Sequence, residues 1–233
     1  MKPSLILLHG LFGGLSNWNY VAKNFENDYK VYIPQLPIFE ENDGNKLDYL
    51  TEFLHHYIKE NNISECVLIG NSLGGHIAIL YSHKYPQFVK GLVLTGSSGL
   101  FENSMLERFP RRHDFDYITE RVQYTFYSPS TVTESLIADV YNVACDNRKC
   151  FQVIKAAKTA QRNYVRQELS EIDILVLLIW GNQDKITPPE VAQEFHSLLK
   201  NSDLKFIDKC GHAPMMEQPV VFNELVSEYL ADL

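Results

Sequence analysis

The segment Gly70-Asn71-Ser72-Leu73-Gly74-Gly75 decides how this chain folds. An apolar run over 66–69 precedes the segment, and an apolar pattern with helical spacing over 77–81 follows it. Gly-x-Ser-x-Gly between a strand and a helix is typical of a nucleophile elbow, a tight turn that raises the serine hydroxyl above the edge of a sheet. The first two glycines supply the small residues that such a turn requires. The segment therefore predicts that Ser72 is a nucleophile at a helix N-terminus, whose dipole favours an oxyanion.

Short apolar runs recur along the chain and predict strands. The runs are largely continuous in apolar residues rather than alternating, as in strands that are covered on both faces. Helical patterns separate the runs, so we expect the α/β class, with a mostly parallel six-stranded sheet flanked by helices. The segment Thr187-Pro188-Pro189-Glu190 predicts the start of one helix, with Thr187 as its N-cap. The six runs lie near residues 5–8, 31–33, 67–69, 91–94, 174–180 and 204–207.

The alternation breaks over residues 101–166, which are rich in aromatic residues and contain no clear strand. We expect residues 1–100 and 167–233 to form the core, and residues 101–166 to form a helical lid over the carboxyl edge of the sheet, where such folds bind ligands. An ordinary helical subdomain with no role in gating is the alternative. Tyr124 and Phe126 are candidate substrate contacts, since an aromatic lid suggests an apolar acyl or alcohol group.

A serine hydroxyl is a poor nucleophile and needs a base, which in turn needs an orienting acid. In this kind of fold the acid and the base follow the serine, in that order. Asp184 comes just after the run 174–180, and His212 comes just after the last run. Because parallel strands end at one edge, we expect Ser72, Asp184 and His212 to converge as nucleophile, acid and base. The alternatives are a turn aspartate and a surface histidine.

Stabilising the transition-state charge requires hydrogen-bond donors. The backbone N–H of Leu73, directly after the nucleophile, is one candidate. The second is expected from the glycine-rich loop 9–14, where we choose Leu11, with Phe12 as the neighbour that could replace it. Phe12 is also a candidate substrate contact. A glycine-rich turn without a ligand is the alternative, and no phosphate-binding motif accompanies the loop.

Composition narrows the class of protein. The 233 residues, 45% of them hydrophobic, suit one large α/β domain with an insertion, and the net charge of −8 argues against a nucleic-acid partner. No apolar stretch approaches the roughly 20 residues of a membrane span, and the first apolar run is too short for a signal peptide. We therefore expect a cytoplasmic protein with a small-molecule substrate and no membrane partner. The oligomeric state is not predicted.

The four cysteines have neither CxxC nor zinc-site spacing, so we expect reduced thiols and no metal. No organic cofactor is expected either, because the predicted chemistry needs only side chains and backbone donors. The cysteines are Cys66, Cys145, Cys150 and Cys210.

Taken together, these motifs resemble the serine branch of the α/β-hydrolase superfamily over essentially the whole chain. The matching segments are His9-Gly10, the elbow segment, Gly181-Asn182-Gln183-Asp184 and Gly211-His212-Ala213-Pro214. Epoxide hydrolases and haloalkane dehalogenases of this superfamily have aspartate at the elbow, so Ser72 argues against both. The family usually has two strands before the His-Gly loop. That loop begins here at residue 9, which implies a shortened, six-stranded sheet.

Residues 68–99 also resemble the carbon–carbon bond hydrolases that cleave ring-fission products. Those enzymes often have an asparagine before the serine, like Asn71, and one in the first loop that Asn17 could match. This resemblance makes Asn71 a candidate substrate contact. The carbon–carbon bond hydrolases differ from this chain at two positions. They usually have tryptophan where this chain has Ala213. They also bind the substrate carboxylate with a lid arginine, where this chain has an apolar residue near Val140. Four arginines of this chain are candidates to replace that lid arginine: Arg111, Arg112, Arg162 and Arg166. The alternative is that all four are solvated surface residues.

We therefore expect a serine hydrolase that cleaves a small or medium carboxylic ester or thioester through an acyl-enzyme. One alternative is a carbon–carbon bond hydrolase of ring-fission products. The other is a non-catalytic small-molecule sensor that retains the three residues.

Overall fold

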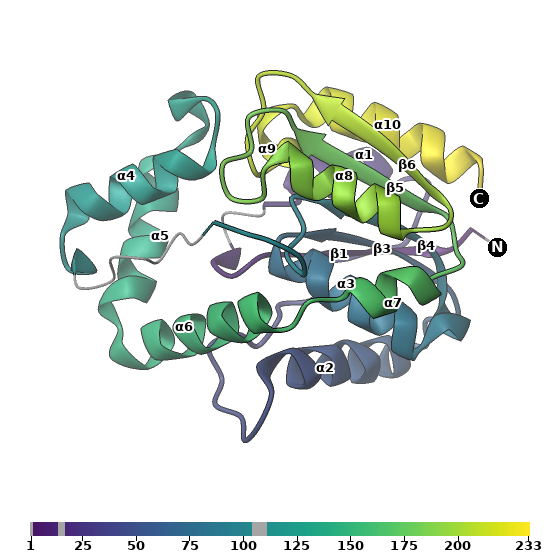
Figure 1. Cartoon of the computed structure of the whole chain (residues 1–233), viewed down its shortest axis with the longest axis horizontal. Coiled ribbons are helices and arrows are strands. Elements are labelled where there is room, and N and C mark those ends of the chain that lie inside the picture. The colour runs from purple at the N-terminus through teal and green to yellow at the C-terminus, as the bar shows by residue number, and fades with distance from the viewer. Residues whose placement is uncertain (1, 14–16, 104–110) are drawn as a thin grey trace.

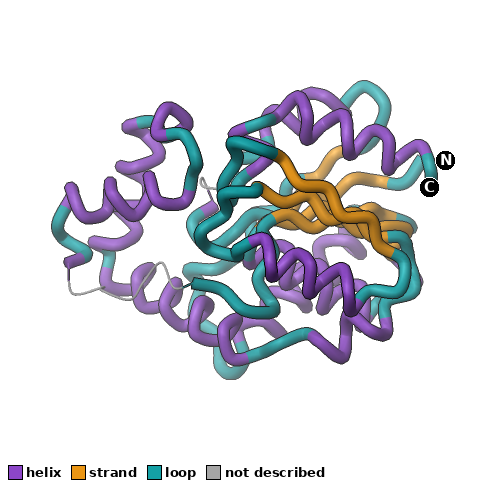
Figure 2. The backbone as a smooth tube through the Cα atoms, turned by 45° about the horizontal axis from the view of Figure 1, so that its top comes forward, coloured by secondary structure: helices purple, strands orange, loops and turns teal. Residues whose placement is uncertain are grey.

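A computed structural model describes residues 2–13, 17–103 and 111–233 of the chain. Its strands form one sheet (Figure 2). The strand order is β2-β1-β3-β4-β5-β6, and every neighbouring pair is parallel. The predicted six-stranded parallel sheet is therefore confirmed. The strands are β1 (Ser4–Leu8), β2 (Val31–Tyr32), β3 (Cys66–Asn71), β4 (Val89–Thr95), β5 (Val176–Gly181) and β6 (Ser202–Ile207).

Helices cover both faces of the sheet, as the apolar strands require (Figure 1). Leu5 and Leu7 of β1 belong to the apolar cluster that includes α1 and α10, whereas Ile6 and Leu8 belong to the cluster of the other face. This alternation within one strand follows from the two-residue period of side chains along a strand. The helices outside the insertion are α1 (Asn19–Phe25), α2 (Lys46–Glu60), α3 (Leu73–Lys84), η2 (Pro86–Phe88), α8 (Pro189–Leu198), α9 (Pro214–Glu217) and α10 (Pro219–Ala231).

The insertion between β4 and β5 is helical over its described residues. Asp114, Thr133 and Asp146 each accept hydrogen bonds from backbone N–H groups at the start of a helix, which explains where three of these helices begin. In Figure 1, α4 and α5 lie beyond one end of the sheet, and α6 leads back toward it. The elements are α4 (Phe115–Thr125), η4 (Pro129–Thr131), α5 (Glu134–Cys145), α6 (Asn147–Arg162) and α7 (Arg166–Glu171).

The predicted N-cap of α8 is wrong. The helix begins at Pro189 with Pro188 as its N-cap residue, and no side chain caps it. The hydroxyl of Thr187 instead donates to the carboxylate of Asp184 at 2.8 Å. An N-cap hydroxyl would accept from a backbone N–H, whereas this hydroxyl is oriented as a donor to a buried, charged acceptor, which makes a strong hydrogen bond.

All four cysteines are free thiols. Burial raises the pKa of Cys66 to about 12, so this thiol is inert at neutral pH. Within the part of the chain that the structure describes, no helix combines the length and apolar character needed to cross a membrane.

Candidate active site

Ser72 lies in the tight turn between β3 and α3, with a φ of 55° and a ψ of −122°. A positive φ is strained for a residue with a side chain, by about 1–3 kcal/mol. The backbone holds it there, because Ser72 N–H donates to Thr95 O at 3.2 Å and Ser98 N–H donates to Ser72 O at 3.1 Å. A Cβ on Gly70 would lie 2.6 Å from the Gly74 carbonyl oxygen. The turn therefore has the geometry of the predicted elbow.

Asp184 and His212 form a buried pair at the same end of the sheet. His212 Nδ1 lies 2.9 Å from Asp184 Oδ2, and the two side chains are almost fully buried. The other oxygen, Oδ1, accepts from the N–H groups of Ile186 at 2.8 Å and Thr187 at 3.0 Å. These bonds hold the carboxylate in place, so His212 Nδ1 donates to it and leaves Nε2 as the basic nitrogen.

The surroundings of His212 favour the protonated imidazole. Burial by itself would lower its pKa, but the charge of Asp184 and its hydrogen bond raise it, and Glu102 and Glu217 raise it further. The net effect is a pKa above the ordinary value of histidine. An imidazole in this environment is well suited to accept a proton from a neighbouring hydroxyl.

The loop that carries Asp184 runs beside the loop that carries His212. Gln183 N–H donates to Cys210 O at 2.9 Å, and Cys210 N–H donates to Gln183 Oε1 at 3.0 Å. A Cβ on Gly181 would overlap the carbonyl oxygen of Gly211, so a side chain would not fit there. These contacts hold the two loops side by side, with the acid against the imidazole.

Asn71 joins the elbow to the histidine loop. Its side-chain amide nitrogen donates to Thr95 O and to His212 O, both at 2.9 Å, and the residue is 1% exposed. The residue before the candidate nucleophile is thus bonded directly to the candidate base. We propose this linking role for Asn71 in place of the substrate contact that the sequence suggested, because its amide nitrogen donates both hydrogen bonds to backbone oxygens.

Gly96 lies just after β4, next to the backbone and the imidazole of His212. It has a φ of 50°, and a Cβ there would lie 2.8 Å from His212 O and 2.9 Å from His212 Nδ1. The absence of a side chain at this position therefore leaves room for the ring. The sequence carries no signal for this role, because Gly96 belongs to none of the motifs.

The candidate oxyanion donors lie on two neighbouring elements. Leu73 is the first residue of α3, where N–H groups point out of the helix end. Leu11 lies in the turn after β1, beside His9, whose ring fixes the loop: Nδ1 donates to Gly10 O at 2.8 Å and Nε2 accepts from Leu36 N–H at 3.0 Å. These positions are compatible with the predicted roles, which remain predictions.

Phe12 lines a cavity of about 690 Å³ between the first loop, the loop 35–40 and α5. Leu11 also lines this cavity, together with Val143 of α5. Contact of Phe12 with substrate stays a prediction.

Tyr124 and Phe126 differ in their surroundings. The ring of Tyr124 lies 5.2 Å from the amine of Lys185, which is next to Asp184, so this residue joins α4 to the acid loop. Phe126 is 2% exposed and packs within an apolar cluster that includes α4 and α10. Its burial gives it a packing role, and contact of either residue with substrate stays a prediction.

Glu102 is a site residue that the sequence analysis missed. Burial raises its pKa to about 7, against the opposing effects of the His212 charge and a hydrogen bond from Gln161. The next residue fixes its position, since Asn103 N–H donates to Ile186 O at 2.7 Å. A single glutamate outside any motif gives no signal in the sequence.

Three of the four insertion arginines considered as carboxylate ligands are engaged elsewhere. Arg111 pairs with Asp114, Arg112 donates to Asn147, and Arg166 pairs with Glu194. Arg162 is exposed on α6. Val140 is 4% exposed and packs in the apolar interior of the insertion. The structure therefore assigns none of the four to a substrate carboxylate.

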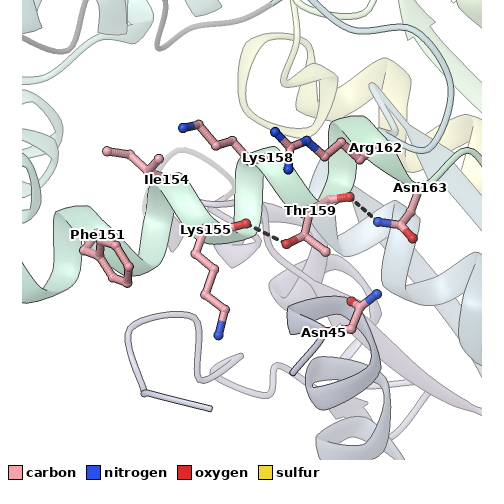
Figure 3. A pocket seen from close by; sticks show the side chains of 8 residues that line it. All are labelled: Asn45, Phe151, Ile154, Lys155, Lys158, Thr159, Arg162 and Asn163. Carbon is pink, nitrogen blue, oxygen red and sulfur yellow. Dashed lines mark hydrogen bonds between the residues drawn. The ribbon is translucent and has the colours of Figure 1, made fainter. Parts of the chain in front are cut away.

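A separate cavity of about 400 Å³ lies along α6 (Figure 3). Lys155 points from the helix toward the segment that holds Asn45, and its amine donates to Asn42 O at 2.7 Å. Lys158 and Arg162 point the other way in this view. Because the three cationic groups do not converge, the cavity does not resemble a site for one anion.

Comparison with known proteins supports the fold and the class of chemistry. The 2-hydroxy-6-oxononadienedioate/2-hydroxy-6-oxononatrienedioate hydrolase 1 of Pseudomonas putida is 26% identical and aligns with 98% of this chain and 88% of its own length. The monoacylglycerol lipase ABHD6 of Bos taurus is 24% identical, over 100% of this chain and 76% of its own length.

Solved structures agree with this result. MGS-MChE2, an alpha/beta hydrolase enzyme from the metagenome of lagoon sediments at Mar Chica, Morocco, has a TM-score of 0.79 and 34% identity, over 100% of this chain and 92% of its own. A model of the alpha/beta hydrolase family matches residues 5–225. The resemblance drawn from the motifs is therefore confirmed, and this chain belongs to the alpha/beta hydrolase family.

Proposed function

We propose that this chain is a serine hydrolase in which Ser72, His212 and Asp184 form the catalytic triad. The observation that carries the proposal is the buried His212–Asp184 pair, which Asn71 ties directly to the strained elbow. A strained backbone conformation persists only where the surrounding structure enforces it, and such conformations cluster at active sites.

In the proposed reaction, His212 Nε2 takes the proton of Ser72 as the hydroxyl oxygen attacks a carbonyl carbon. Asp184 stabilises the imidazolium through the bond to Nδ1. The backbone N–H groups of Leu11 and Leu73 receive the developing oxyanion. The imidazolium then protonates the leaving group, and water, deprotonated by His212, hydrolyses the acyl-enzyme.

Two substrate classes fit this mechanism. The relatives support the carbon–carbon class more directly than the ester class, because a hydrolase of 2-hydroxy-6-oxononadienedioate aligns over nearly the whole chain. A carboxylic ester is the second candidate. The similarity to a monoacylglycerol lipase favours the ester. So do Ala213 and Val140, which stand where the carbon–carbon hydrolases have a tryptophan and a lid arginine.

We also propose that residues 101–166 act as a lid on the core formed by 1–100 and 167–233. The support is the bond from His212 N–H to Thr125 O, 3.0 Å long, which joins the histidine loop to the end of α4. A segment in this position borders the substrate, so its shape would select the acyl or alcohol group.

The test compares turnover of a coloured ring-fission dienoate with turnover of p-nitrophenyl acetate and p-nitrophenyl octanoate. Wild-type protein and Ser72→Ala are measured in parallel, and Ser72 is labelled with a fluorophosphonate. We expect turnover of at least one class, and a loss of at least about 10³-fold in the variant. Equal rates for both proteins would refute the triad. Labelling at Ser72 without turnover of any substrate would favour the sensor alternative.

A further inference from the structure

Glu217, at the end of α9, joins two segments that are far apart in sequence. One carboxylate oxygen, Oε1, accepts from Gly211 N–H at 2.8 Å, just before the candidate base. The other, Oε2, accepts from Tyr127 N–H at 2.7 Å and from Ser128 N–H at 3.4 Å, just after α4. The two oxygens thus hold the histidine loop on one side and the insertion on the other.

The junction between these segments is closely packed. His212 N–H donates to Thr125 O at 3.0 Å, which adds a direct bond between the two segments. A Cβ on Gly211 would lie 2.8 Å from both Thr125 O and Tyr127 N, and 3.0 Å from Glu217 Oε1. With so little free space, a shift of the chain after α4 must shift the backbone that carries the imidazole.

We propose that Glu217 is a positioning residue for His212, coupling the orientation of the imidazole to the end of α4. The inference rests on the proposed function, in which His212 is the base. A carboxylate suits this task because the groups that bond it are backbone N–H donors, and an ionised carboxylate only accepts. A glutamine would turn its own NH₂ group toward one of the two segments and lose that side of the junction.

Glu217 also acts on His212 through its charge. Burial raises the pKa of Glu217 above its ordinary value, although the backbone N–H groups oppose this shift and favour the ionised form. The negative charge of the ionised carboxylate raises the pKa of His212, as do Asp184 and Glu102. Removing the charge should therefore lower the pKa of His212. Such a change in acid–base behaviour would not follow from loss of packing alone.

The test uses the full chain with Glu217→Gln, Glu217→Asp and the control Glu224→Gln, which removes an exposed carboxylate of α10. The substrate is p-nitrophenyl acetate, or the dienoate if only that is turned over, and unfolding is followed by circular dichroism. For Glu217→Gln we expect kcat to fall about 10- to 100-fold, KM to change less than about threefold, and the acid limb to move to lower pH.

Glu217→Asp separates position from charge, since it keeps the carboxylate but shortens its reach. We expect it to lose kcat about 10-fold while the acid limb stays near that of the wild type. The inference is overturned if both variants keep kcat within twofold of Glu224→Gln, or if kcat falls only in proportion to the unfolded fraction. Ser72→Ala is measured beside them. If that variant is active, the proposed function fails, whatever the Glu217 variants do.

Discussion

The position of Gly96 offers a sharp test of how closely the imidazole is held. In Gly96→Ala the new Cβ would lie 2.9 Å from His212 Nδ1 and 3.1 Å from Cε1, where ordinary contacts begin near 3.4 Å. The shortfall at Nδ1 is 3.4 minus 2.9, or about 0.5 Å. Gly96 follows β4 and contacts a buried ring, so we expect the His212 loop to take up most of the displacement.

The size of the effect follows from this displacement. A misplacement of about 1 Å costs about 10²-fold in rate, so about 0.5 Å should cost about 10-fold in kcat, or about 1.4 kcal/mol. The positive φ adds about 1–2 kcal/mol of strain in folding for a residue with a Cβ. For a chain of this size that strain should lower Tm by about 2–8 °C.

Gly44→Ala is the matched control, because Gly44 also has a positive φ, of 107°, but nothing lies within 4 Å of its Cβ position. It should lose stability and keep its kcat. Initial rates on the substrate that the wild type turns over, normalised by fluorophosphonate titration of active protein, measure kcat for both variants. If Gly96→Ala keeps kcat within twofold of Gly44→Ala, the imidazole tolerates displacement and the reasoning fails.

The other predictions concern buried polar groups around the site. Thr187→Val removes a 2.8 Å donor to Asp184, and should lower kcat about fivefold, or about 1 kcal/mol, in steady-state kinetics; an unchanged kcat would show that the backbone donors suffice. Burial lowers the pKa of His76 from 6.5 to about 4, so the unfolded chain binds the proton more tightly. The free energy of unfolding should therefore fall by about 3 kcal/mol as pH drops from 6.5 to 4. Urea unfolding at several pH values measures this fall, and the His76→Asn variant should not show it. Glu102→Gln removes a charge that raises the pKa of His212 and should move the acid limb of kcat/KM to lower pH; an unmoved limb would show that this charge does not influence the base.

Local sterics made much of the fold readable from the sequence. The elbow needs small residues at Gly70 and Gly74, because their Cβ atoms would meet neighbouring backbone oxygens, and few other local structures impose that pattern. Short, continuously apolar runs suit strands that are covered on both faces, as β1, β3 and β5 are, so hydrophobicity and run length indicated a parallel sheet. The order of Ser72, Asp184 and His212 along the chain, each after a strand, was readable for the same reason.

The partner of each buried polar group was decided only in three dimensions. Thr187 has the local sequence of an N-cap, yet its hydroxyl bonds Asp184. Asn71, next to the nucleophile, bonds a backbone oxygen of His212, 141 residues away. Glu217 bridges two loops that no motif connects. The physical reason is that hydrophobic periodicity and turn sterics act between near neighbours, whereas a buried donor or acceptor must pair with whatever the folded chain brings within about 3 Å.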